Sequence, residues 1–224
     1  MICKLILIVM KKNILITGGA GFIGYHISKK LLDEGWRVIG LDCMSDYYDV
    51  SLKERRESML LQNASYRSVH EKVETPNVLI NLFEAESPNV VIHLAAQPLV
   101  RRSYIDPVET YSTNVMGTVH LLEAVRQTSS VRAVVNVTTD KCYENKEWVW
   151  SYRENEPMGG FDPYSNSKGC AELVTAAYRN SFFNKKNHDE HQVALATARA
   201  GNVIGGGDWA NDRLIPDVMR AIVT

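Results

Sequence analysis

The sequence lacks several features that would each point to a particular class of protein. Its four cysteines, Cys3, Cys43, Cys142 and Cys170, contain no C-x-x-C pair, so we predict no metal site and expect reduced thiols in the cytoplasm. The 25 basic and 26 acidic side chains nearly cancel. This balance gives no reason to expect nucleic acid or an anionic membrane as a partner.

Long apolar runs are also missing, and none approaches the roughly 20 residues that a membrane-spanning helix needs. The short run M-I-C-K-L-I-L-I-V at the start is open to two interpretations, a signal-peptide remnant or an upstream extension. No small-residue cleavage site follows it, and Met10 directly precedes two lysines and a clear strand. We therefore favour translation from Met10, with residues 1–9 as an extension.

A glycine-rich turn follows the first strand. N-I-L-I-T at 13–17 is continuously apolar, as in a strand buried on both faces, and it leads into T-G-G-A-G-F-I-G, a helical pattern and a second strand that ends at Asp42. Glycines at this spacing let the backbone approach a pyrophosphate, while a later acid binds the adenosine ribose and repels a 2′-phosphate. We predict a site for NAD, rather than NADP, formed by Gly18, Gly21, Phe22, Ile23, Gly24 and Asp42.

Strands and helices alternate along the rest of the chain, with further strands expected at 66–69, 89–96, 131–138 and 193–199. This alternation predicts an α/β fold with a doubly wound parallel sheet, a Rossmann fold, whose ligands bind beyond the carboxyl ends of the strands. We expect residues 10–200 to form the dinucleotide-binding domain. The small pair Ala95 and Ala96 allows a cofactor to approach closely, whereas His93 is expected to be a packed core histidine.

Tyr164 and Lys168 lie four residues apart, just after Pro163, which is a typical helix start. This spacing places both side chains on one helical face. A tyrosine with a pKa of about 10 becomes a base near neutral pH only if about 4 kcal/mol is supplied. A neighbouring ammonium and an oxidised nicotinamide ring are expected to supply it. Such a pair is usually a surface pair, and it gains meaning here from the dinucleotide site that precedes it.

The motifs T-G-x-x-G-x-x-G, H-L-A-A and Y-x-x-x-K together resemble the extended short-chain dehydrogenase/reductase family of nucleotide-sugar enzymes. Residues 97–224, with Q-P-L-V-R-R-S-Y, T-T-D-K-C-Y-E-N-K-E-W-V-W and R-A-G-N-V-I-G-G-G-D-W, resemble CDP-glucose 4,6-dehydratase. Residues 10–92, with T-G-G-A-G-F-I-G and D-Y-Y-D-V-S-L-K-E-R-R, look closer to UDP-glucuronate 4-epimerase. Both families bind NAD through the first half, so the second half decides the reaction.

The resemblance implies that Tyr164 takes the proton of the sugar O4 while C4 gives a hydride to NAD. A dehydratase must also remove the C5 proton and protonate the departing C6 hydroxyl, which requires a second acid/base pair. Asp140 is the candidate acid and Lys141 the candidate base, although many related dehydratases have Glu at the position of Lys141. Thr138 or Thr139 is expected to hydrogen-bond O4, with Thr139 preferred. The alternative for Asp140 and Lys141 is a surface pair that ends a strand.

The resemblance also implies a longer chain, with residues 201–224 beginning a lobe that binds the nucleotide sugar, most of it beyond Thr224. We expect Asn114 to support the cofactor site, and Arg101, Asn202, Gly207 and Asp208 to contact the substrate. The resulting hypothesis is a cytoplasmic, homodimeric or larger NAD-dependent lyase that dehydrates CDP-glucose for deoxysugar and polysaccharide synthesis. A UDP-glucuronate 4-epimerase and a non-catalytic NAD-binding fragment remain alternatives.

Overall fold

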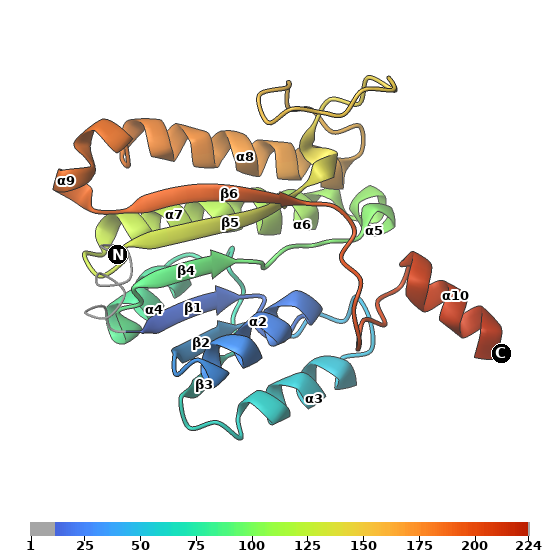
Figure 1. Cartoon of the computed structure of the whole chain (residues 1–224), viewed down its shortest axis with the longest axis horizontal. Coiled ribbons are helices and arrows are strands. Elements are labelled where there is room, and N and C mark those ends of the chain that lie inside the picture. Colours follow the sequence, from blue (N-terminus) through green and yellow to red (C-terminus); the bar gives the residue numbers. More distant parts are fainter. Residues whose placement is uncertain (1–11, 224) are drawn as a thin grey trace.

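The computed structural model describes residues 12–223, so the predicted extension at 1–9 lies outside the described part. A six-stranded parallel sheet with the order β3-β2-β1-β4-β5-β6 forms its centre (Figure 1). The strands are β1 (Asn13–Thr17), β2 (Arg37–Leu41), β3 (Tyr66–Val69), β4 (Val90–His93), β5 (Ala133–Thr139) and β6 (Ala194–Ala200). The predicted doubly wound sheet is confirmed, and every expected strand is present within a few residues of its predicted bounds.

The strand order reverses between β1 and β4, where neighbouring connections leave the sheet in opposite directions. Thr17 pairs with Leu41 on one side and with His93 on the other, so β1 lies between the two halves. In doubly wound sheets, ligands bind in the crevice that opens at this switch point.

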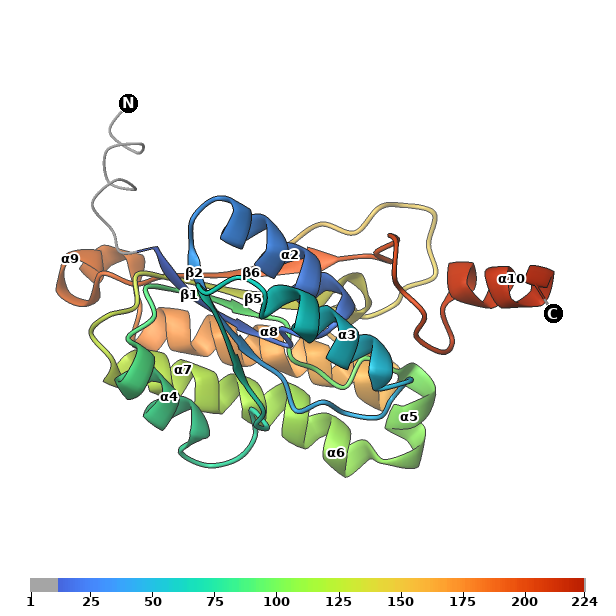
Figure 2. The ribbon, with the colours of Figure 1, turned by 90° about the horizontal axis from the view of Figure 1, so that it is seen from below.

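Helices cover the sheet on both faces (Figures 1 and 2). α2 (Phe22–Asp33) and α3 (Ser51–Leu60) lie on one face. The other face carries α4 (Val78–Glu86), α7 (Gly117–Gln127) and α8 (Pro163–Ser181). Shorter segments connect these elements: α5 (Val100–Ile105), α6 (Pro107–Tyr111), η1 (Ser112–Met116), η2 (Asp140–Cys142), η3 (Lys185–Asn187) and α9 (His188–His191). The helix α10 (Leu214–Val223) follows β6.

The core is continuous beneath the second helical layer. Its largest fully buried side chains include Leu15, Phe83 and Leu121. His93 also lies inside, with its Nδ1 atom 2.7 Å from Oγ1 of Thr17, and burial lowers its pKa to about 3. The ring is therefore neutral and hydrogen-bonded at neutral pH, as predicted for a core histidine.

The helical segment that begins at Pro107 contains a π-helical turn, η1, between α6 and α7. A π turn inserts one extra residue and shifts the helical register. Asn114 lies in this turn and is 2% exposed. The register shift thus turns an amide side chain toward the interior, while Leu121 and Val125 pack against the core from α7.

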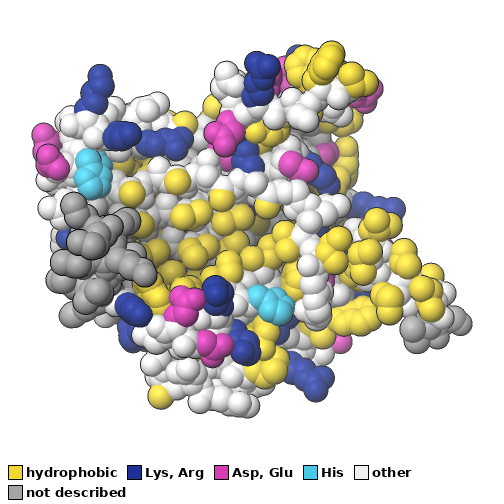
Figure 3. Space-filling view, in the orientation of Figure 1, with side chains coloured by type: hydrophobic (Ala, Val, Ile, Leu, Met, Phe, Trp, Pro, Cys, Tyr) yellow, Lys and Arg dark blue, Asp and Glu magenta, His cyan; other side chains and the backbone are white. Residues whose placement is uncertain are grey.

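In the described chain, no helix covers β5 and β6 on the face that α2 and α3 share. Ala194, Ala196 and Ala198 of β6 are exposed there, and hydrophobic side chains gather across the middle of this face (Figure 3). Residues 201–213 then cross toward α2, and α10 projects outward (Figure 1). A domain boundary at residue 200 stays a prediction. Within residues 12–223, no helix combines the length and apolarity needed to cross a bilayer.

Candidate active site

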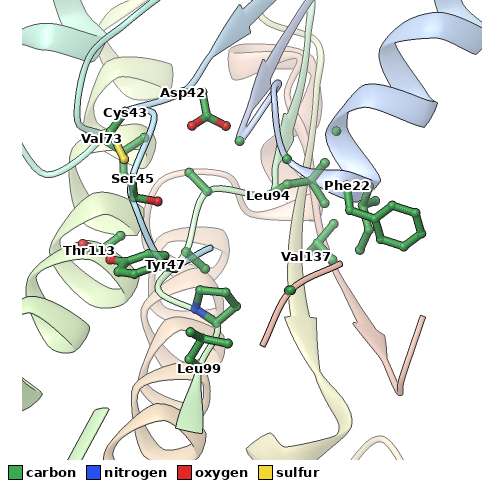
Figure 4. Close-up of a pocket in the computed structure, with 18 of the residues that line it drawn as sticks. Phe22, Asp42, Cys43, Ser45, Tyr47, Val73, Leu94, Leu99, Thr113 and Val137 are labelled. Atoms are coloured by element: carbon green, nitrogen blue, oxygen red, sulfur yellow. The ribbon is translucent and has the colours of Figure 1, made fainter. Parts of the chain in front are cut away.

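A cavity of about 510 Å³ opens beyond the carboxyl ends of the central strands. Figure 4 shows Asp42 and Phe22 on opposite sides of one end of it, with Tyr47 and Leu99 toward the other. Most of the predicted site residues line this cavity: Gly18, Gly21, Phe22, Ile23, Gly24, Asp42, Ala95, Ala96, Thr139, Lys141, Tyr164, Lys168, Asn202 and Asp208. The structure therefore brings together residues from strand ends that are far apart in the sequence.

The glycine turn shapes one wall of the cavity. Gly18 has a φ of +74°, a conformation that side chains rarely adopt. A Cβ atom at Gly24 would lie 2.1 Å from the carbonyl oxygen of Gly18, so only glycine fits between helix and turn. Gly21 precedes α2, and no side chain caps the helix there. The first N–H groups of α2 are therefore left for another acceptor, such as an anion.

Asp42 follows β2 directly beside the glycine turn and is 6% exposed. Its carboxylate accepts hydrogen bonds from the N–H groups of Ala20 at 3.2 Å and Met44 at 2.9 Å. It also forms an ion pair with Lys53, whose Nζ lies 3.1 Å from Oδ1. The sequence-based prediction did not include Lys53, because the segment D-Y-Y-D-V-S-L-K-E-R-R indicated only a loop followed by a helix.

Tyr164 and Lys168 lie on the face of α8 that meets the cavity. Asp162 caps this helix by accepting the N–H of Ser165 at 2.9 Å. Burial raises the pKa of Tyr164, while a hydrogen bond with Thr139 and the charge of Arg213 act in the opposite direction. The lowering of the pKa of Tyr164 by Lys168 together with an oxidised nicotinamide ring stays a prediction.

The ammonium of Lys168 is 7% exposed and donates to the carbonyl oxygen of Val137 at 3.3 Å. Burial lowers the pKa of Lys168 to about 8, although the charge of Glu172 opposes this shift. Glu172 follows Lys168 by one helical turn on α8 and is itself buried. It forms an ion pair with Arg199 at 3.0 Å. Burial thus makes the charged form of Lys168 costly, but a pKa of about 8 still leaves the side chain mostly charged at neutral pH.

The two threonines at the end of β5 have different partners. The hydroxyl of Thr138 donates to Glu172, away from the cavity. Thr139 is hydrogen-bonded to Tyr164 and also donates to Oδ1 of Asp140 at 3.1 Å. This geometry favours Thr139 over Thr138 as the side chain next to Tyr164.

Asp140 and Lys141 begin η2, directly after β5. Lys141 lines the cavity and is otherwise exposed. Asp140 does not line it, but a Cβ atom at the lining residue Gly201 would lie 3.4 Å from Oδ2 of Asp140. The two side chains therefore stand at the rim, within reach of the Tyr164 end of the cavity.

Besides Asp140, three predicted residues lie outside the cavity wall. Asn114 sits behind it, where its amide bonds both backbone groups of Gln97 and the hydroxyl of Ser167 at 2.8 to 3.1 Å. Arg101 is exposed and pairs with Asp212 at 3.2 Å. The carbonyl oxygen of Gly207 accepts from Arg56 at 2.7 Å. Asn114 is therefore placed to support the wall, and Arg101 and Gly207 bond protein groups.

Sequence reasoning also missed cavity residues other than Lys53. Tyr47 donates to Oε1 of Glu109 at 3.0 Å, and both residues line the cavity. Arg213 lines it near Tyr164, and its buried Nε has no hydrogen-bond partner among the described residues. The segment D-R-L-I-P that contains Arg213 follows the quoted G-G-G-D-W and could have been included on that ground. Within residues 12–223, no group of three His, Cys, Asp or Glu side chains is placed to hold a metal ion.

Extended short-chain dehydrogenases/reductases are the class of protein that this fold and cavity define. The match to the family model described as GDP-mannose 4,6 dehydratase covers residues 15–185, so the chain belongs to that family.

A CDP-glucose 4,6-dehydratase of Salmonella typhimurium is 54% identical over 215 residues, which are 94% of this chain and 57% of that protein. Among solved structures, UDP-glucuronic acid 4-epimerase from Bacillus cereus, in complex with UDP-glucuronic acid and NAD, matches with a TM-score of 0.81 at 25% identity. A dTDP-glucose 4,6-dehydratase from Streptomyces venezuelae, with NAD bound, matches with a TM-score of 0.80 at 27% identity. Each structural match covers 94% of this chain and 62% of the other. The chain thus spans less than two thirds of these relatives, and the resemblance to the two enzyme groups is confirmed.

Proposed function

We propose that this chain binds NAD and carries the acid/base half of an NAD-dependent CDP-glucose 4,6-dehydratase, a hydro-lyase that forms CDP-4-keto-6-deoxyglucose. The observation that carries the proposal is the pair Asp140 and Lys141 at the cavity rim, next to Thr139. An epimerase needs no acid or base at C5 and C6, whereas a dehydratase needs both. The relative from Salmonella typhimurium supports the choice of nucleotide sugar.

The cavity fits a dinucleotide in its chemistry. The glycine turn would hold the pyrophosphate against the uncapped start of α2, and Asp42 would accept a ribose hydroxyl. When bound, NAD would take a hydride from C4 of the sugar and return it to C6. The small side chains Ala95 and Ala96 leave room for the ring at the end of β4.

The chain's own residues move the protons. Tyr164 takes the proton of O4, and Thr139 holds the tyrosine oxygen in position. The C4 ketone acidifies the C5 proton, which passes to the amine of Lys141. Asp140 gives its proton to the departing C6 hydroxyl, so that one water leaves and a C5–C6 double bond forms. When the hydride returns to C6, Lys141 gives a proton back to C5, which completes the 4-keto-6-deoxy sugar.

Arg213, Asn202 and Asp208 line the same cavity and are proposed to meet the nucleotide sugar. The unpartnered Nε of Arg213 supplies a donor for a phosphate or sugar oxygen. The relatives continue beyond the region that this chain matches. In the proposal, contacts from that further region complete the substrate pocket. A cytoplasmic location and a homo-oligomeric state belong to the proposal as well.

Replacing Gly24 with alanine is expected to weaken NAD binding by about tenfold or more and to cost about 1–3 kcal/mol of stability. The added Cβ atom would collide with the backbone oxygen of Gly18 at 2.1 Å and push the glycine turn out of place. Calorimetric titration of residues 1–224 with NAD measures the effect. Gly206→Ala is the matched control, because a Cβ atom there meets nothing within 4 Å. Wild-type affinity in Gly24→Ala would contradict the placement of the coenzyme.

Product analysis tests the proposed reaction. A chimera that joins residues 1–224 to the C-terminal part of the Salmonella typhimurium relative is incubated with NAD and CDP-glucose, and the product is identified by NMR. The proposal predicts a 4-keto-6-deoxy sugar. Residues 1–224 alone are expected to bind NAD without turnover, because positioning that contributes about 7–11 kcal/mol is incomplete. Robust turnover by residues 1–224 would contradict that part of the proposal.

Epimerisation of UDP-glucuronate is the second candidate. The structural matches to the epimerase from Bacillus cereus and to the dehydratase are equally good, at TM-scores of 0.81 and 0.80, and the segment D-Y-Y-D-V-S-L-K-E-R-R favours the epimerase. The same chimera is therefore offered UDP-glucuronate. A galacturonate product, with CDP-glucose left unchanged, would replace the dehydratase proposal by the epimerase. NAD binding without either product would favour the third alternative, a non-catalytic module.

A further inference from the structure

A buried lysine lies against the carboxylate that we expect to meet the adenosine ribose. Nζ of Lys53 is 3.1 Å from Oδ1 of Asp42, and both side chains are 7% exposed. The same ammonium donates to Oγ of Ser45 at 3.0 Å. Asp42, Ser45 and Lys53 all line the cavity, and Figure 4 shows Asp42 and Ser45 along the same wall. An isolated Asp would present a full negative charge here, whereas this pair is formally neutral.

The hydrogen bonds of the pair limit what it can offer a ligand. A carboxylate has about four lone-pair positions. Three of those on Asp42 are used by Lys53, Ala20 and Met44. An ammonium has about three donors, and Lys53 uses two of them. The wall therefore retains one acceptor on Asp42 for a ribose hydroxyl and one cationic donor on Lys53.

A second cation reinforces this side of the cavity. Arg56 follows Lys53 on α3, is 6% exposed and donates to the hydroxyl of Tyr48 at 2.9 Å. Both cations lie near the ring of Tyr48, whose centroid is 5.6 Å from Nζ of Lys53 and 5.7 Å from Cζ of Arg56. Asp46 also lines the cavity. Glu71, Lys72 and Glu74 line the cavity too, whereas Arg56 does not. Two buried cations, Lys53 and Arg56, therefore lie on the Asp42 side, so the charge next to Asp42 does not exclude an added phosphate.

We propose that Lys53 determines how strongly this site discriminates between NAD and NADP. Asp42 repels a 2′-phosphate, and the adjacent ammonium offsets that repulsion and offers the phosphate a donor. NAD is preferred, because Asp42 still accepts a ribose hydroxyl, but NADP binds measurably. The inference rests on the proposed function, in which this cavity is the NAD site.

The test is calorimetric titration of residues 1–224 with NAD and with NADP at one salt concentration. In Lys53→Met, the affinity for NADP is expected to fall by about tenfold or more, because the carboxylate is left uncompensated, while the affinity for NAD falls by less than about threefold. In Asp42→Asn, the ratio of the affinity for NADP to the affinity for NAD is expected to rise by about tenfold. Lys185→Met is the matched control: Lys185 is exposed and does not line the cavity. Its ratio is expected to change by less than about threefold.

Each outcome decides the question. A ratio that stays constant in Lys53→Met and in Asp42→Asn overturns the inference while the proposed function stands. Equal losses for both coenzymes in Lys53→Met would make Lys53 a purely structural residue and overturn it too. If Lys53→Met fails to fold by circular dichroism, Lys53→Gln, which removes the charge and keeps a hydrogen-bond donor, decides in its place. A wild type that binds neither coenzyme overturns the proposed function, and the inference with it.

Discussion

Replacing Lys168 with methionine is expected to make the chain more stable at neutral pH while removing the proposed activity. Burial lowers the pKa of Lys168 from 10.5 to about 8. At 1.36 kcal/mol for each unit, the charged side chain costs the folded state up to about 3 kcal/mol. Methionine has a similar length and no charge, so it removes this cost. Such a trade between stability and activity is common where a functional group is buried.

The stability difference between the wild type and Lys168→Met is expected to depend on pH. Because the folded-state pKa lies below the unfolded-state value, the unfolded chain binds more protons between about pH 8 and 10.5. The stability contribution of the wild-type lysine therefore rises across that window. The advantage of Lys168→Met should be full below pH 8 and fade as the pH approaches 10.5.

Urea unfolding of the wild type and Lys168→Met at pH 7 and pH 10 measures both parts of the prediction. Lys185→Met removes an equal charge from an exposed position and should change stability by less than about 0.5 kcal/mol. A Lys168→Met variant that is less stable than the wild type at pH 7 would contradict the account. It would mean that the attraction of Glu172 outweighs burial.

Replacing Lys141 with methionine in the chimera is expected to lower dehydration by about 10²–10⁴-fold, the usual contribution of a positioned base. Oxidation at C4 should persist, because Tyr164 and Lys168 are unchanged and Lys141 stands at the rim. Single-turnover absorbance of reduced nicotinamide, followed beside product formation, separates the two steps.

Lys141→Glu provides the matched variant for this experiment. It restores a base of the kind that many related dehydratases have at this position, so it should recover part of the lost rate. Equal loss of oxidation and dehydration in Lys141→Met would show that Lys141 only supports the structure. Full dehydration in that variant would assign the C5 proton to another group.

The fold could be predicted from the sequence because the patterns that indicate it are local. Apolar runs such as N-I-L-I-T mark strands buried on both faces, and the glycines at 18, 21 and 24 mark the turn between strand and helix. The strand order and the common edge then follow from general rules of α/β topology. Most of the cavity lining could therefore be predicted from residue types at strand ends.

The side-chain contacts within the site could not be predicted from the sequence in the same way. The partner of Asp42 lies 11 residues further on, and the approach of Lys53 depends on the path of the loop between β2 and α3. The choice between Thr138 and Thr139 depends on Glu172, on a different element. The direction of the pKa shift of Tyr164 depends on how deeply it is buried. These properties arise from tertiary packing, and no local pattern encodes them.

The fate of the C5 proton is the most direct test of the central claim, that Asp140 and Lys141 make this site a dehydratase. The chimera is incubated with NAD and CDP-glucose in deuterium oxide, and the product is examined by NMR. The account predicts a 4-keto-6-deoxy sugar with solvent deuterium at C5, because the C5 proton passes to a base that exchanges with solvent. A sugar inverted at C4 that retains its original hydrogen at C5 would contradict it.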